Sequence, residues 1–314
     1  MSNPCAHDPQ VAIEAPTMSN PSTPTGTKRL SSRVALWIVR GLCVALLVFY
    51  IYFYFDQERW IFEPNTDPTG SKATEEINYA FEGWLSPPNQ VYLSTAEIPQ
   101  RTEVLLHFRK FNARSESAKG SILYFHGNKG NLEKCRWQIG GFLDKGYDVW
   151  MMDYRTYGSS TGPLSETALV NDARMFYSYL QDKQGVNEEE LIIWGRSFGS
   201  GIAASVAANN SPKMLVLETP YWSLPDTARR TNPLMLPFLF RYHLPTYQYL
   251  EFIDCPVHLI HGDSDEKISH RSSEELEKRC EQLNVKVELH PIKGGRHNFR
   301  ETDEYLKVEQ TILE

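Results

Sequence analysis

The stretch Leu191-Ile-Ile-Trp-Gly195-Arg196-Ser197-Phe198-Gly199-Ser200-Gly201-Ile-Ala-Ala-Ser205 joins an apolar run, a Gly-x-Ser-x-Gly pattern and a run of small residues. This order is typical of a strand that ends at a serine on a strained turn, with a helix starting directly behind it. Gly195 and Gly199 remove side chains where strand and helix press against the turn, and Ala203 lets the helix pack closely on a sheet. We therefore expect Ser197 to be a nucleophile, provided that the rest of the chain supplies its partners.

Alternating strands and helices around this stretch predict one α/β domain. The expected strands are Gln90–Thr95, Thr102–Phe111, Gly120–Phe125, Tyr147–Asp153, Leu191–Trp194, Met214–Leu217, Val257–Ile260 and Val285–Leu289, with helices over Leu164–Gln181 and Ser269–Leu283. The first two strands look like an antiparallel pair. The others predict a mostly parallel central sheet with helices on both faces, and loops after the strands' carboxyl ends that carry the site.

Composition narrows the class of protein. The 314-residue chain is 41% hydrophobic and 12% aromatic, which is enough for a large core, and its net charge of −7 argues against a nucleic-acid partner. The five cysteines show no C-x-x-C spacing, and their odd number excludes a fully paired disulfide framework. We expect buried thiols, no metal and no cofactor.

The N-terminal part predicts a tail and a membrane anchor. Residues 1–32 are rich in Pro, Ser, Thr and Asn, which predicts a disordered tail. The apolar run Val34–Phe55 would form a helix of about 33 Å, enough to cross a hydrocarbon core of roughly 30 Å. Arg40 lies near its start, where the side chain can reach the headgroups. We predict a transmembrane anchor over residues 33–56 and a catalytic domain over residues 57–314.

The charges that flank this run predict its orientation. Basic residues lie on its N-terminal side and acidic residues on the other, so the positive-inside rule places the N-terminus in the cytoplasm of a single-pass membrane protein. A cleaved signal peptide is a weaker alternative, because no small-x-small cleavage site follows the run. A buried core helix fits poorly, because no polar stripe is present.

A serine hydroxyl is a weak nucleophile until a positioned histidine removes its proton and a carboxylate orients that histidine. After a strand–serine–helix turn, the chain order is serine, acid, histidine. His297, in Lys293-Gly-Gly-Arg-His297-Asn-Phe299, follows the last predicted strand in a loop whose glycines let the backbone aim the imidazole. A surface histidine is the alternative interpretation. His261 belongs to the preceding strand.

The acid is expected after a strand between Ser197 and His297. The run Val257-His-Leu-Ile-His261-Gly-Asp-Ser-Asp-Glu266 offers three carboxylates, of which we prefer Asp265 to Asp263, although the sequence barely separates the two. Glu218 is a further candidate, which we interpret instead as a cap of the turn that follows it.

The oxyanion of an acyl-transfer intermediate needs two backbone N–H donors near Ser197. One is expected from Phe198, the residue after the nucleophile, and the other from Asn128 in the loop His126-Gly-Asn-Lys-Gly-Asn131. A phosphate-binding loop is the competing interpretation. It is disfavoured because the loop lacks both G-x-x-x-x-G-K-[ST] and G-x-G-x-x-G.

Five motifs together resemble the α/β-hydrolase superfamily, and more narrowly its membrane-anchored abhydrolase-domain and serine aminopeptidase-like branch. They are His126-Gly-Asn128, Asp153-Tyr-Arg-Thr-Tyr-Gly-Ser-Ser-Thr-Gly162, Gly195-Arg-Ser-Phe-Gly-Ser-Gly201, His261-Gly-Asp-Ser-Asp265 and Gly295-Arg-His-Asn298. The likeness covers about residues 90–312, besides the anchor and Gln57–Pro64. It implies Asp265 as the acid, His297 as the base and Asn128 and Phe198 as the oxyanion donors. It also implies that Asp153 and Arg155 brace the loops. Lys129 and Arg296 depart from the family pattern and add positive charge near the mouth of the site.

The segment Tyr221–Asp254, after the sixth predicted strand, is long enough only for a short cap. It contains the apolar run Pro233–Phe240, in which we expect Leu236 and Phe238 to bind the acyl group of a small-molecule or lipid-like substrate. A buried cap helix is the alternative. The predicted reaction is ester or thioester hydrolysis through an acyl-enzyme. Amide hydrolysis, or a non-catalytic membrane-tethered interaction protein, remains open.

Overall fold

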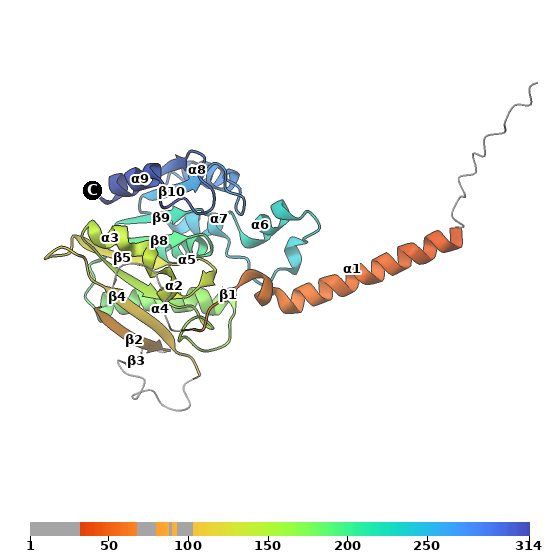
Figure 1. Ribbon diagram of the computed structural model, residues 1–314, viewed down its shortest axis with the longest axis horizontal. Helices are drawn as coiled ribbons and strands as arrows, with labels where there is room; N and C mark the ends of the chain where they lie inside the picture. The colour runs from red at the N-terminus through yellow and green to blue at the C-terminus, as the bar shows by residue number, and fades with distance from the viewer. Residues whose placement is uncertain (1–31, 68–79, 88–89, 93–102) are drawn as a thin grey trace, which may run out of the picture. The chain divides into compact units, whose positions relative to one another are not determined.

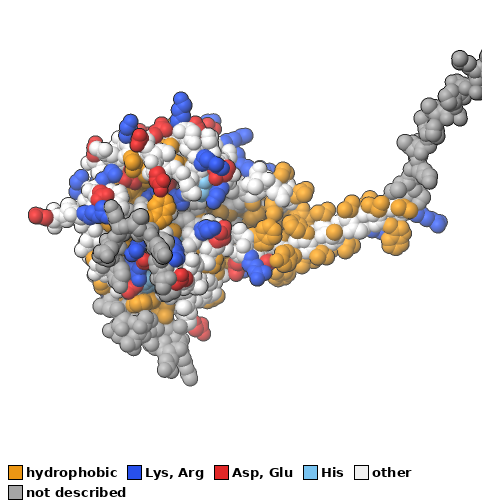
Figure 2. Space-filling model, viewed as in Figure 1, with side chains coloured by type: hydrophobic (Ala, Val, Ile, Leu, Met, Phe, Trp, Pro, Cys, Tyr) orange, Lys and Arg blue, Asp and Glu red, His pale blue; other side chains and the backbone are white. Residues whose placement is uncertain are grey.

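The computed structural model describes residues 32–67, 80–87, 90–92 and 103–314. The predicted tail lies outside these residues except for Ser32. By internal contacts the chain divides into two units, Met1–Phe49 and Tyr50–Glu314. Helix α1 (Ser32–Ile61) includes the predicted anchor, continues past residue 56, and is long and apolar enough to cross a membrane. Figure 2 shows apolar side chains along this helix.

The second unit is built on a mixed sheet. In the described residues its nine strands follow the order β11-β10-β9-β8-β5-β7-β4-β2-β3 (Figure 1). They are β2 (Phe81–Ser86), β3 (Gln90–Tyr92), β4 (Leu106–Phe111), β5 (Gly120–Phe125), β7 (Tyr147–Met152), β8 (Leu191–Arg196), β9 (Met214–Glu218), β10 (Val257–Gly262) and β11 (Val287–Ile292). The strands from β11 to β7 are parallel, which confirms the predicted mostly parallel sheet.

The expected antiparallel pair at the start of the sheet was wrong. Strand β2 lies between β3 and β4 and pairs with both of them. The prediction omitted β2, whose run Phe81-Glu-Gly-Trp-Leu-Ser86 has no clean alternation of apolar and polar residues. Residues 93–102, which the two predicted strands also included, lie outside the described residues.

Helices cover both faces of the sheet, as predicted, because neighbouring side chains of each strand point to opposite faces. In β5, Leu123 and Phe125 join one apolar core, whereas Ile122 and Tyr124 join the other. The helices that pack on the first core are α4 (Glu166–Asp182), α5 (Phe198–Ala207) and α8 (Arg271–Gln282). The helices that pack on the second core are α2 (Leu132–Cys135), α3 (Gly140–Asp144) and α9 (Asp303–Leu313).

The cap, Tyr221–Asp254, lies between β9 and β10 and is short, as predicted. It contains α6 (Leu224–Thr231), a 3-10 turn over Pro237–Leu239, α7 (Thr246–Tyr249) and a 3-10 turn over Leu250–Phe252. The alternative of a buried helix over Pro233–Phe240 was wrong. Its two prolines disfavour a continuous helix, and the segment forms an exposed turn in which only Phe240 is buried.

The docking segment, Tyr50–Asn65, joins the end of α1 to the cap within the same unit. The buried Gln57 amide donates to the carbonyl of Leu239 (2.6 Å) and accepts from the N–H of Arg241 (2.8 Å). The Phe53 ring packs on Phe240, with centroids 5.1 Å apart. Strand β1 (Glu63–Pro64) then pairs with β6 (Lys129–Gly130). The segment therefore runs from the cap to the loop that contains Asn128.

Candidate active site

Ser197 occupies the turn between β8 and α5, here called the Ser197 turn (Gly195–Gly199). Its φ of 51° and ψ of −120° are strained for a residue with a side chain. Its N–H donates to the carbonyl of Glu218 (2.8 Å), which fixes the turn to β9. A Cβ at Gly195 would collide with α5, and one at Gly199 with the carbonyl of Phe125. The two glycines are thus required by the close approach of strand and helix.

His297 and Asp265 come from the loops that follow β11 and β10. The Nδ1 atom of His297 lies 2.8 Å from Oδ2 of Asp265, and both side chains are buried. The other oxygen of Asp265 accepts the backbone N–H groups of Lys267 (2.8 Å) and Ile268 (3.0 Å). Asp263 is exposed and accepts instead from Ser264 and Gly294. The structure therefore brings Asp265, and not Asp263, to the histidine.

His261 is a second histidine at this carboxylate. It is fully buried, and its Nε2 lies 3.3 Å from Oδ2 of Asp265 and 3.0 Å from the carbonyl of Ile268. Its Nδ1 lies 2.6 Å from the Ser273 hydroxyl. Burial by itself raises the pKa of Asp265, but hydrogen bonds from His261 and His297 outweigh it and hold that pKa well below its usual value. Asp265 is thus a stable carboxylate.

The two predicted oxyanion donors line the same cavity as Ser197. Within the described part of the chain, no backbone carbonyl accepts the N–H of Asn128 or of Phe198. The docking segment holds Asn128 on two sides: its side-chain amide donates to the carbonyl of Ile61 (2.9 Å), and its own carbonyl accepts from the N–H of Glu63 (3.0 Å). The end of α1 therefore helps to position this loop.

Glu218 does not cap a turn, and that interpretation was wrong. Its carboxylate is buried and accepts from Nε of Arg196 (2.9 Å) and Nε of Arg300 (2.8 Å). Arg196 also donates to the carbonyl of His297 (3.1 Å) and to Asn298 (2.6 Å). Burial by itself raises the pKa of Glu218, but the two guanidinium groups have the larger effect, so the pKa is lower than usual. This cluster links the Ser197 turn to the His297 loop.

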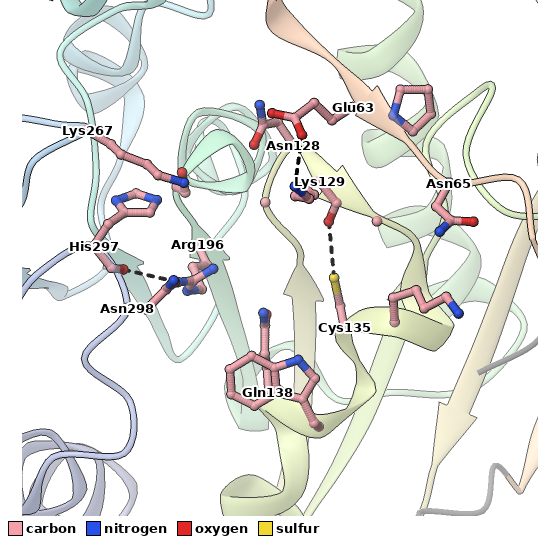
Figure 3. Close-up of a pocket in the computed structure, with 16 residues that line it drawn as sticks. Glu63, Asn65, Asn128, Lys129, Cys135, Gln138, Arg196, Lys267, His297 and Asn298 are labelled. Atoms are coloured by element: carbon pink, nitrogen blue, oxygen red, sulfur yellow. Dashed lines mark hydrogen bonds and ion pairs between the residues drawn. The ribbon is translucent and has the colours of Figure 1, made fainter. Parts of the chain in front are cut away.

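Two cavities meet at Ser197, with volumes of about 580 and 350 Å³. Both are lined by Glu63, Asn128, Ser197, Lys267 and His297. Figure 3 shows Lys267 extending above His297 toward the middle of the larger one.

Leu236 and Phe238, the predicted acyl-binding residues, line neither of the two cavities, so the structure does not bring them to Ser197. The turn at Pro237 leaves the Phe238 side chain in solvent, with 76% of its surface exposed. Phe240, which is 6% exposed, lies in the wall of the smaller cavity instead, together with Tyr221 from the start of the cap.

Comparison with known proteins agrees with this fold. A family model described as the alpha/beta hydrolase fold matches residues 120–243, which run from β5 through the Ser197 turn into the cap. The chain has the alpha/beta hydrolase fold. The esterase Pf2001 of Pyrococcus furiosus is similar in fold, with a TM-score of 0.62 at 17% identity, over 81% of this chain and 97% of that one.

Among curated relatives, this chain is 29% identical to the lysophosphatidylserine lipase ABHD12 of Danio rerio, over 59% of its own length and 55% of that protein. It is 30% identical to the alpha/beta hydrolase domain-containing protein 17B of Xenopus laevis, over 58% of its own length and 62% of that protein. The matches thus span little more than half of these relatives.

The sequence interpretation missed several residues that line or hold the candidate site. Ile61 and Glu63 belong to the Gln57–Pro64 run, which the sequence marks only as part of the family likeness and, at Glu63, of the acidic flank of the anchor. Lys267 follows the chosen acid by two positions. The sequence signal that could have indicated them is their position beside the predicted anchor and beside the predicted acid.

Proposed function

We propose that this protein is a serine hydrolase that cleaves acyl esters or thioesters, with Ser197 as nucleophile, His297 as base and Asp265 as the residue that orients the base. The observation that carries the proposal is His297, which lines the same cavity as the strained Ser197 and is bonded behind it to the buried carboxylate of Asp265. The fold and the curated lipase relative support hydrolysis of a lipid-like substrate.

In this mechanism, His297 Nε2 takes the Ser197 proton as Oγ attacks the acyl carbonyl, while Asp265 holds Nδ1–H and stabilises the imidazolium. The N–H groups of Asn128 and Phe198 bind the oxyanion. The imidazolium then protonates the leaving alcohol or thiol, and the acyl group stays on Ser197. Water, deprotonated by His297, releases it as a carboxylic acid.

The membrane part of the proposal rests on α1. We propose that α1 spans the membrane once, with the N-terminus in the cytoplasm, because basic residues precede its apolar run and acidic residues follow it.

Labelling with a fluorophosphonate probe tests the nucleophile. We expect the wild-type protein to be labelled and Ser197→Ala to remain unlabelled. Labelling of Ser197→Ala at the wild-type level would show that another residue is the nucleophile.

A matched pair of aspartate variants tests the acid. Asp265→Asn is expected to lower kcat on an acyl ester by roughly 10³- to 10⁴-fold, because the histidine loses the carboxylate that fixes its tautomer. Asp263→Asn removes an exposed carboxylate two positions away and is expected to change kcat less than about twofold. Equal losses in the two variants would contradict the assignment.

A further inference from the structure

The two cavities that meet at Ser197 differ in chemistry. The smaller one is walled by the apolar side chains of Ile61, Tyr221, Leu224, Phe240 and Ile268. The larger one is more polar than the smaller one. Beside Glu63 and the apolar Trp137, its lining contains Asn65, Lys129, Lys134, Gln138 and Arg196. A substrate whose acyl carbonyl lies at Ser197 therefore has an apolar space on one side and a polar space on the other.

The basic side chains that line only the polar cavity are neutralised by carboxylates. The guanidinium of Arg196 is bound by Glu218, and the ammonium of Lys129 lies 3.2 Å from Glu63. The ammonium of Lys134 lies 3.7 Å from Asp67. Their positive charges are largely balanced within the protein.

Lys267 differs from these residues. Its side chain is exposed, it lines both cavities, and no carboxylate of the described residues lies within 4.0 Å of its ammonium. The neighbouring acids are engaged elsewhere, because Asp265 is bound by His297 and Glu266 by Arg296 at 3.3 Å. An unbalanced cation beside the nucleophile attracts an anionic group of the substrate.

We propose that Lys267 forms an anion subsite, so that the substrate is an amphiphile with its acyl chain in the apolar cavity and an anionic leaving group in the polar one. The inference rests on the proposed function and adds the substrate class to it. A phosphate or carboxylate on the leaving alcohol would lie against the Lys267 ammonium while the ester carbonyl stays at Ser197.

Two esters that differ only in the anion test this subsite. Full-length protein in neutral detergent micelles is assayed with 1-oleoylglycerol and with 1-oleoylglycerol 3-phosphate, which share the acyl chain and the ester bond. We expect the wild-type protein to have the higher kcat/KM on the phosphate. Lys267→Gln is expected to lower the phosphate-to-neutral ratio of kcat/KM about tenfold, as loss of a charge-assisted hydrogen bond does.

Two further variants separate this role from a general effect of charge. Lys267→Arg is expected to keep most of the wild-type ratio, because it keeps the cation. Lys307→Gln removes an exposed lysine from α9, outside both cavities, and is expected to leave the ratio unchanged. Added salt is expected to lower the wild-type ratio, since the attraction is screened.

The outcomes separate this inference from the proposed function. A wild-type ratio near one, no cleavage of either ester, or an equal loss on both esters in Lys267→Gln would overturn the anion subsite, even if the probe still labels Ser197. Cleavage that persists in Ser197→Ala would overturn the proposed function itself.

Discussion

The Ser197 turn and the cap border the same cavity but are stabilised in different ways. Every residue of β8 and α5 is buried, so the turn between them is held by the main cores of the sheet. Within α6, only Pro225 is buried, and Phe238 is 76% exposed. The end of the cap near Tyr242 and Leu250 joins the first core, but its outer part at Leu239 and Arg241 is held by Gln57, up to 184 positions away in the chain. The Ser197 turn thus depends on the core, whereas the outer part of the cap depends on a few long-range contacts.

The largest loss of stability is expected from a change of Glu218, the single buried carboxylate that links the Ser197 turn to Arg300. Glu218→Gln leaves Arg196 and Arg300 buried without a counter-charge and is expected to lower the free energy of unfolding by about 3–5 kcal/mol. Urea unfolding at pH 7 measures it. Glu301→Gln, which changes an exposed carboxylate, is the control. An equally small effect of both variants would show that the turn does not depend on the cluster.

Acid provides an independent test of the same cluster. The pKa of Glu218 is lower in the folded protein than in the unfolded chain, where it is about 4.3. The stabilisation is therefore fully present above that pH and is lost as the pH falls through the folded pKa. We expect the stability of the wild-type protein to decline more steeply on acidification below pH ~4 than that of Glu218→Gln. If the free energies of unfolding of the two proteins fell in parallel as the pH is lowered, this expectation would be contradicted.

The outer part of the cap is expected to lose stability when the side-chain amide of Gln57 is removed. Gln57→Ala leaves the carbonyl of Leu239 and the N–H of Arg241 without their partner, which costs about 1–3 kcal/mol. The damage is expected to be local: faster proteolysis within the cap and a higher KM for acyl esters, with little change in kcat. Gln248→Ala, an exposed amide in α7, is the matched control. A large fall in kcat with an unchanged KM would show that Gln57 supports Ser197, His297 and Asp265 instead.

The contrast between local and long-range contacts explains which features could be predicted from the sequence. The Ser197 turn, the parallel strands and the acid–histidine order follow from local patterns, because glycine spacing and β-branched runs act on neighbouring residues. The structure then separated Asp265 from Asp263 by one hydrogen bond to His297. The roles of Glu218 and Gln57 were missed because their partners lie far away in the chain. No local pattern records which distant groups a buried side chain meets.

The smallest effect is expected on the outer surface of the cap. Phe238→Ser is expected to change the free energy of unfolding by no more than about 0.5 kcal/mol, because the side chain already contacts solvent. Its kcat/KM on short and long acyl esters in solution is expected to match the wild-type values, since Phe238 lines neither cavity. Leu236→Ser is expected to behave alike. A selective loss on long-chain esters would mean that the cap closes over the acyl chain during the reaction. The wall at Phe240 would then describe only the open state of the cap, and its contacts with the docking segment would have to break and re-form in each cycle.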